Sequence, residues 1–130
     1  MGVTVISANE SEVILKAPLA RNTNHKLTAF GGSIHSLAVL SCWALITETV
    51  IQAGFEPEYI VIQNGEMGYE SPVNGDFIAR SSWDSNTSKE KFFETLRRKR
   101  LARATLHSQI EVDGIVCARL TARFVADVKN

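Results

Sequence analysis

A short polar loop and the glycine pair after it hold the residues best suited to chemistry in this sequence. Asn24 offers a carboxamide, Thr28 offers a hydroxyl, and Gly31–Ser33 opens a long apolar run. Neutral donors beside the positive end of a helix can stabilise negative charge that develops on a carbonyl oxygen. We therefore predict that Asn24 and Thr28 are catalytic. The residues predicted to bind the substrate are Phe30, Gly31, Gly32, Ser33, His35 and Ser36.

Each of these residues also has a purely structural explanation. Asn24 could hold a turn through its own side chain, as asparagine often does. The glycine pair could meet only the steric needs of a junction between loop and helix. His35 and Ser36 could be packing residues with satisfied hydrogen bonds. The glycine pair therefore indicates a functional site only in combination with the neighbouring asparagine and threonine.

Size and charge narrow the class of protein. The 130 residues are 45% hydrophobic, which suits a single globular domain over residues 1–130. The 14 lysines and arginines balance the 14 aspartates and glutamates, so we expect neither a nucleic-acid nor a membrane partner. Cys42 and Cys117 are too few for a disulfide framework and are expected to be buried, which favours a reducing, cytoplasmic setting. No metal site is predicted.

One helix and several strands must position the polar loop. Residues 33–52 are apolar on nearly all sides, which predicts a long buried helix that ends near Gly54. Two short runs, 3–6 and 13–15, indicate a strand pair or one strand with a ragged leader. Residues 59–69 indicate another strand. Membrane insertion of the helix is not expected, because its polar residues leave no unbroken apolar run of about 18 residues.

Hairpin signals organise the rest of the chain. Asn74-Gly75 predicts a tight turn that folds a strand at 77–83 back along the strand before it. Residues 84–89 are expected to form a loop, and residues 90–99 a short helical turn. Strict alternation over 102–112 and 116–126 predicts an antiparallel hairpin.

This order of elements predicts an α+β hotdog fold, in which an antiparallel sheet of about five strands wraps one central helix. Such a sheet covers only part of so apolar a helix. We therefore expect a homodimer or a higher homo-oligomer.

Several blocks of the chain resemble a known family. Residues 17–19, 22–24 and 28–33, followed by Trp43, are similar to the signature of the hotdog-fold "putative thioesterase" domain, which in proteobacteria occurs alone or behind an acetyltransferase domain. Residues 69–76 resemble its next block, and residues 100–125 resemble its closing hairpin. His35 stands where an aromatic residue is expected. The resemblance covers nearly the whole chain.

The resemblance implies an activity. Members of this family are implicated in decarboxylating malonyl groups on acyl carrier protein, which yields an acetyl starter unit for fatty acid or polyketide synthesis. The implied partner is acyl carrier protein or a CoA thioester. The implied substrate is carried on phosphopantetheine, and no further cofactor is expected.

The helix lacks the acid that many hotdog thioesterases place two turns from its start. Its first acid, Glu48, lies ~22 Å beyond Ser33 at the rise of an α-helix, so hydrolysis would need a base such as His35, Glu66 or a neighbouring subunit. Loss of carbon dioxide needs no base, because the leaving carboxylate supplies the electron pair. Decarboxylation is therefore the first hypothesis. Thioester hydrolysis and a non-catalytic acyl-thioester binding dimer are the alternatives.

One basic cluster could recognise the carrier. Arginine side chains suit the acidic surface of a carrier protein and the phosphate of its pantetheine arm, although charged runs are often only solvated turns. The residues predicted to dock the carrier protein are Arg97, Arg98, Lys99, Arg100 and Arg103.

Overall fold

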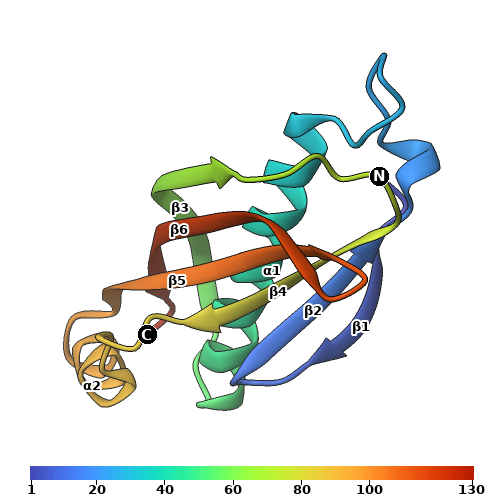
Figure 1. The fold of residues 1–130 in the computed structure, drawn as a ribbon. Helices are drawn as coiled ribbons and strands as arrows, with labels where there is room; N and C mark the ends of the chain where they lie inside the picture. The colour runs from blue at the N-terminus through green and yellow to red at the C-terminus, as the bar shows by residue number, and fades with distance from the viewer.

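Six antiparallel strands curve around one long helix in the computed structural model, which describes residues 1–130 (Figure 1). The strand order is β1-β2-β4-β5-β6-β3. The elements are β1 (Thr4–Ala8), β2 (Glu12–Ala17), a 3-10 turn (Leu19–Arg21), α1 (Gly31–Gln52), β3 (Pro57–Tyr69), β4 (Phe77–Trp83), α2 (Lys89–Lys99), β5 (Leu101–Val112) and β6 (Ile115–Val128). The α+β hotdog fold is confirmed. The sheet exceeds the expected five strands because β1 is a separate strand paired with β2.

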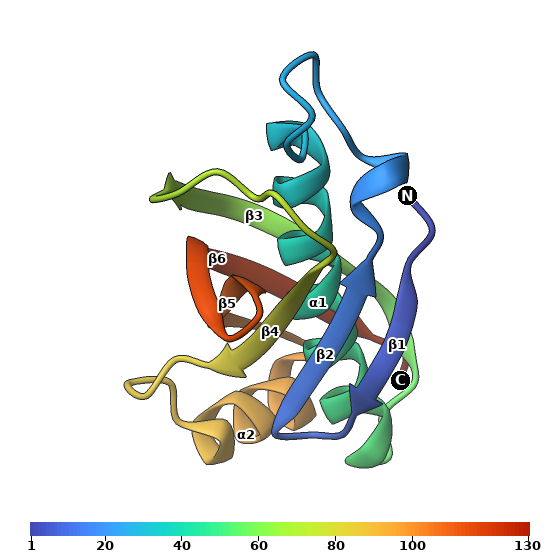
Figure 2. The same cartoon turned by 45° about the vertical axis from the view of Figure 1, so that its right-hand side comes forward.

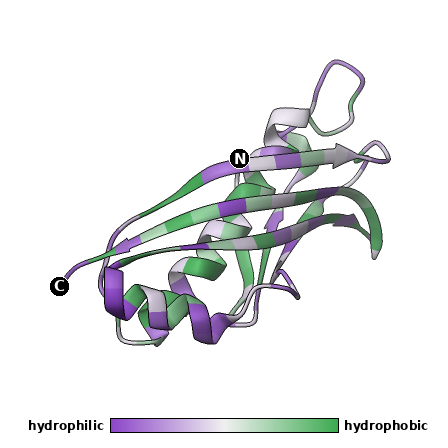
Figure 3. Ribbon diagram, turned by 90° about the vertical axis from the view of Figure 1, so that its left-hand side faces the viewer, coloured by the Kyte–Doolittle hydropathy of each residue, from purple (hydrophilic) through white to green (hydrophobic).

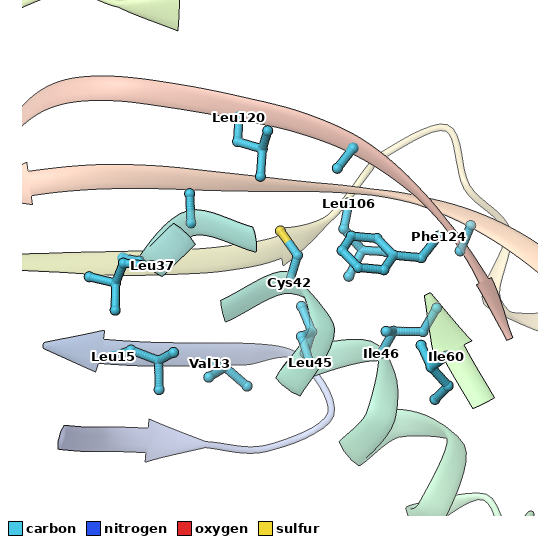
Figure 4. Packing of buried hydrophobic residues seen from close by; sticks show 14 of the residues in the cluster. Val13, Leu15, Leu37, Cys42, Leu45, Ile46, Ile60, Leu106, Leu120 and Phe124 are labelled. Atoms are coloured by element: carbon cyan, nitrogen blue, oxygen red, sulfur yellow. The ribbon is translucent and has the colours of Figure 1, made fainter. Parts of the chain in front are cut away.

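Helix α1 is the core of the fold. Its buried side chains include Leu37, Cys42 and Leu45, which face residues of the sheet such as Leu106 and Phe124 (Figure 4). Its length and composition alone would allow it to cross a membrane, but half of its most apolar window is buried inside the protein. The sheet therefore provides the apolar surroundings that the helix needs.

Polar contacts fix the helix at its end and at its middle. Gly54 has φ +90° and its N–H donates to Ile51 O at 2.9 Å, so the predicted glycine cap is confirmed. The hydroxyls of Ser41 and Ser108 are 2.7 Å apart, and both residues are buried. This pair ties α1 to β5 inside an otherwise apolar core.

The closing hairpin is confirmed. The pairing of β5 with β6 runs from Leu101 opposite Asp127 to Val112 opposite Ile115. Asp113 and Gly114, in the turn between the strands, both have positive φ. Along these strands hydrophobic and hydrophilic residues alternate (Figure 3). The hydrophobic set faces α1, and the polar set faces outward.

The predicted hairpin between β3 and β4 is wrong. β3 pairs with β6, whereas β4 pairs with β2 and β5. The segment between them instead packs against the polar loop, where Ala29 N–H donates to Val73 O at 2.7 Å and Leu19 N–H donates to Asp76 Oδ1 at 2.8 Å. Burial of Val73 and these bonds outweigh the local preference of Asn-Gly for a tight turn.

Residues 89–99 form a full helix rather than a short turn. The Ser88 hydroxyl caps α2 by accepting a hydrogen bond from Lys91 N–H at 3.2 Å. Phe92 and Leu96 lie one turn apart and are both buried, so α2 has one apolar face despite its charge.

Candidate functional site

The polar loop is organised by Asn24. Its Oδ1 accepts hydrogen bonds from Lys26 N–H at 2.8 Å and from Thr28 N–H at 3.2 Å, which is the pattern of a side-chain-stabilised turn. Its Nδ2 donates to Thr28 Oγ1 at 2.9 Å and to Ala29 O at 3.4 Å. The amide therefore works inside the loop and holds the Thr28 hydroxyl in place. Because that hydroxyl accepts from Asn24, its own proton remains available to a ligand.

A second buried asparagine anchors the loop to its surroundings. Asn22 is 3% exposed, and its Nδ2 donates to Pro18 O at 2.7 Å and to Met1 O at 3.0 Å. The backbone carbonyl oxygen of Asn22 accepts a hydrogen bond from Phe30 N–H at 2.6 Å. Asn22 therefore sets where the loop joins α1.

The first turn of α1 leaves two backbone donors without a partner. Ser33 N–H donates to Phe30 O at 3.0 Å, so it is already used. The N–H groups of Gly31 and Gly32 have no acceptor in the protein, as is usual for the first residues of a helix. The exposed Phe30 ring lies against Gly32 so closely that a Cβ there would be 2.4 Å from it. Glycine at this position leaves room for the ring.

These groups meet at one depression of about 310 Å³ beside the start of α1. It is lined by Asn24, Thr28, Ala29, Gly31, Ile34 and residues 69–73. The hydroxyl of Tyr69 donates to Gly31 O at 3.3 Å, which fixes the end of β3 to the helix. Of the predicted site residues, the structure brings Asn24, Thr28 and Gly31 together here.

A carboxylate that the sequence reasoning did not assign lies in the same depression. Glu70 is the only acid among the lining residues, and its Oε2 accepts from Arg119 Nε at 3.0 Å. Both side chains are about half exposed. Glu70 adjoins Tyr69 in a block that resembles the family. Nothing in the local sequence shows that this block packs beside the loop that holds Thr28.

His35 and Ser36 lie on a different surface. They line an apolar groove of about 530 Å³ between α1 and β3, together with residues such as Trp43 and Val61. Both are exposed and make no side-chain hydrogen bond within the chain, so they are not packing residues with satisfied bonds. Trp43 Nε1 donates to Ile60 O at 2.9 Å and holds the groove's two walls together.

The basic cluster lies far from the depression. Arg97, Arg98 and Lys99 end α2, and Arg103 lies on β5, at the opposite end of the protein from the loop before α1 (Figure 2). Arg98 Nη1 is 3.8 Å from Glu94 Oε1 on an exposed face. Arg100 adopts the left-handed conformation that ends α2 and donates to Lys129 O at 3.5 Å. One protomer therefore does not place this cluster beside the donors.

The side chains form no grouping of three or more histidines, cysteines or acids that could hold a metal ion. Both cysteines are buried, as the sequence predicts. Burial raises the pKa of the Cys42 thiol to about 12, so the thiol stays protonated at neutral pH. The polar side chains that line the depression offer hydroxyl, amide and carboxylate groups.

A six-stranded antiparallel sheet wrapped around one long central helix, with a polar depression at the start of that helix, defines a hotdog protein. The chain belongs to the family described as "Putative thioesterase (yiiD_Cterm)", whose model matches residues 1–128. No curated protein matches the sequence.

Solved structures support the same class. A putative thioesterase from Shewanella oneidensis is 26% identical, with 98% of this chain and 85% of that chain covered and a TM-score of 0.86. A protein of unknown function from Chlorobaculum tepidum TLS is 29% identical over 100% of this chain and 84% of that one, with a TM-score of 0.88. A probable thioesterase from Pseudomonas aeruginosa is 22% identical over 98% and 84%, with a TM-score of 0.82, and shows the shared fold alone.

Proposed function

We propose that this protein removes carbon dioxide from a malonyl-type thioester on acyl carrier protein and leaves the acetyl-type thioester. The observation that carries the proposal is the meeting of the Thr28 hydroxyl and the free N–H of Gly31 in one depression. These donors are neutral and are fixed before the substrate binds. They suit an oxyanion that forms on a thioester carbonyl.

The reaction needs little else from the protein. The bond between the malonyl carboxylate and the α-carbon breaks, and its electron pair forms the enolate. Negative charge gathers on the thioester oxygen, where Thr28 and the start of α1 would stabilise it. A solvent proton then restores the α-carbon. Neither a metal nor a nucleophile is required by this sequence of steps.

Glu70 would disfavour the negative charge of the substrate's malonyl carboxylate in the ground state. It is an acidic neighbour for the malonyl carboxylate, and no lysine, arginine or histidine is among the residues that line the depression. A bound carboxylate would therefore find little countercharge to hold it in the ground state, which favours its departure as neutral carbon dioxide.

Hydrolysis is the second candidate function, and Glu70 is also the observation that favours it. A carboxylate beside a thioester could activate water as a general base. The family description as a thioesterase supports the same reaction. In that case the carrier thiol would be released together with the free acid.

Mass analysis of the carrier protein distinguishes the candidates. Malonyl-loaded and acetyl-loaded carrier are incubated separately with the protein. We expect malonyl carrier to lose the mass of carbon dioxide and acetyl carrier to remain unchanged. Free thiol formed from malonyl carrier without an acetyl intermediate would establish hydrolysis instead. Binding of both carriers with no change in mass would establish an acyl-thioester binding protein.

We further propose that a second copy of the chain covers the apolar groove. Strand β3 spans 13 residues and has a hydrogen-bonded partner on only one side. Trp43, Val61 and Ile62 are exposed beside that open edge. Pairing of two β3 edges would satisfy the open backbone groups and bury these side chains.

Sedimentation tests the dimer. Val61→Glu should convert a dimer to a monomer, because a charge would be buried in the interface. Ile115→Glu is the matched control, since Ile115 is exposed at the start of β6. A wild-type monomer at micromolar concentration would contradict the proposal.

A further inference from the structure

A second group of hydrogen-bonded polar side chains lies on the outer face of the sheet. His107 on β5 and Thr121 on β6 are direct cross-strand partners. His107 Nδ1 is 3.0 Å from Thr121 Oγ1, and His107 Nε2 is 2.6 Å from Asp84 Oδ1. A hydroxyl, an imidazole and a carboxylate are thus connected in series. This series is the arrangement by which an enzyme activates a hydroxyl nucleophile.

The direction of the hydrogen bonds follows from the carboxylate. The hydrogen bond to His107 lowers the pKa of Asp84, so this carboxylate is ionised at neutral pH and can only accept. Nε2 of the neutral imidazole must then carry the proton. Nδ1 is left as the acceptor for the Thr121 hydroxyl. The imidazole is therefore oriented to receive the threonine proton.

The hydroxyl opens onto a depression that could hold a small ligand. Thr121 lines a space of about 370 Å³ together with Glu66, Met67, Gly68, Glu70 and Arg119. Arg119 lies two residues from Thr121 and so projects from the same face of β6. It contacts Glu70 through Nε, which leaves its terminal nitrogens available. These nitrogens could stabilise an oxyanion formed by attack of Thr121.

We propose that Thr121, His107 and Asp84 form a second, esterase-like site for small polar acyl esters. Thr121 Oγ1 attacks the ester carbonyl carbon while His107 Nδ1 takes its proton, and the new oxyanion lies beside Arg119. Collapse of this intermediate breaks the bond to the alcohol, which leaves with the proton from His107. Water, activated by the same imidazole, then cleaves the acyl-Thr121 ester and releases the acid. Asp84 holds His107 in the reactive tautomer throughout.

Covalent trapping with diisopropyl fluorophosphate tests this site. Attack of Thr121 Oγ1 on phosphorus breaks the P–F bond, releases fluoride and passes the threonine proton to His107. Peptide mass mapping should place one adduct per chain on Thr121. Thr121→Val should abolish the adduct, whereas Thr121→Ser should retain it. The rate of labelling should fall by about 10²–10⁴-fold in His107→Gln and in Asp84→Asn.

The control variant is Thr105→Val. Thr105 is on β5, two residues from His107, and it pairs with Arg123 rather than with Thr121. Its replacement should leave labelling unchanged. Thermal unfolding of each variant shows whether it is folded. Absence of an adduct on the folded wild type, or labelling that persists in folded Thr121→Val, would overturn the proposal. Turnover of malonyl carrier should be the same in Thr121→Val as in the wild type, so this test is independent of the proposed decarboxylation.

Discussion

The Thr28 hydroxyl is the donor around which the candidate site is built. Asn24 donates to it at 2.9 Å and thereby directs its proton away from the loop. The side-chain amide of Asn24 donates its hydrogen bonds within the loop, to Thr28 Oγ1 and Ala29 O. Asn24 thus positions Thr28. In the proposed reaction, the hydroxyl would contact the substrate oxygen and the amide would act through it.

Removing the hydroxyl should therefore reduce decarboxylation sharply. Thr28→Val is expected to lower kcat by about 10²–10³-fold, which is the usual effect of losing one oxyanion donor. Asn24→Ala should have a similar effect, because the loop then loses the bonds that hold Thr28. His25→Ala is the control, since His25 is exposed in the same loop. Wild-type turnover of malonyl carrier by Thr28→Val would remove this residue from the mechanism.

Glu70 provides a test of whether a base takes part. Removal of a general base costs about 10²–10⁴-fold in rate. Glu70→Gln is expected to keep most of the decarboxylation rate, to bind malonyl carrier more tightly and to abolish any release of free thiol. Mass analysis of the carrier in a single turnover measures these rates. Glu66→Gln serves as the control, since Glu66 is outside the depression that holds Thr28. A collapse of decarboxylation in Glu70→Gln would indicate that Glu70 takes part as an acid or base.

Single residues were predictable where their type implies a local role. Asn24 and Thr28 are four residues apart, so their shared turn follows from sequence. Glu70 lies more than forty residues from that loop, and its approach depends on the tertiary bond between Ala29 and Val73. No local pattern encodes such a contact.

At the scale of elements, a polar clamp between Asp84 and His107 helps to hold the connection between β4 and α2. Asp84 directly follows β4, and its bond to His107 fixes the connection to the sheet. The side chain of Asp84 is 22% exposed. The clamp therefore positions the start of α2 as well as orienting the imidazole.

The clamp should stabilise the protein in a pH-dependent manner. The hydrogen bond from His107 lowers the folded-state pKa of Asp84, so its contribution is present above the unfolded pKa of about 3.9 and is lost as pH falls through the folded pKa. Asp84→Asn should therefore lower the Tm at pH 7, and the difference should shrink below about pH 3 to 4. Calorimetry over this range measures it. The control is Asp113→Asn, in an exposed turn without an ion pair, whose effect on Tm should not depend on pH. If Asp84→Asn lowered the Tm equally at all pH values, the proposed linkage would be contradicted.

Elements were predictable where one periodicity was strong. The run of residues that are apolar on nearly all sides predicted α1, and the strict alternation of apolar and polar residues predicted the β5–β6 hairpin. Helix α2 was underestimated because its charged residues hide Phe92 and Leu96, which are spaced by one helical turn. The placement of β3 was not predictable from its turn signal, since strand order depends on which edges meet around α1.

At the scale of the whole molecule, the basic cluster and the donors occupy opposite ends of one protomer. If a carrier protein docks on the cluster, its pantetheine arm must reach a depression on another subunit or cross the protein surface. The sequence could not reveal this separation, because it depends on the direction of α1 relative to α2.

Docking on the cluster predicts a dependence on ionic strength. Raising the salt concentration should raise the KM for malonyl carrier protein and leave kcat largely unchanged, because salt screens exposed charges but does not reach fixed backbone donors. Steady-state kinetics between low and high salt measure both constants. Malonyl-CoA is the comparison substrate and should show a smaller change in KM. A KM for the carrier that is independent of salt would exclude this docking role.

The buried Cys42 can serve as a probe of conformational opening between α1 and the sheet. Its thiol is fully buried at the contact of α1 with the sheet, and its pKa of about 12 makes it inert while the core is closed. A thiol reagent can therefore modify it only when the helix separates from the sheet. The rate at which the reagent modifies Cys42 therefore reports how often the helix separates from the sheet. Ligands that bind at the start of α1 should lower this rate.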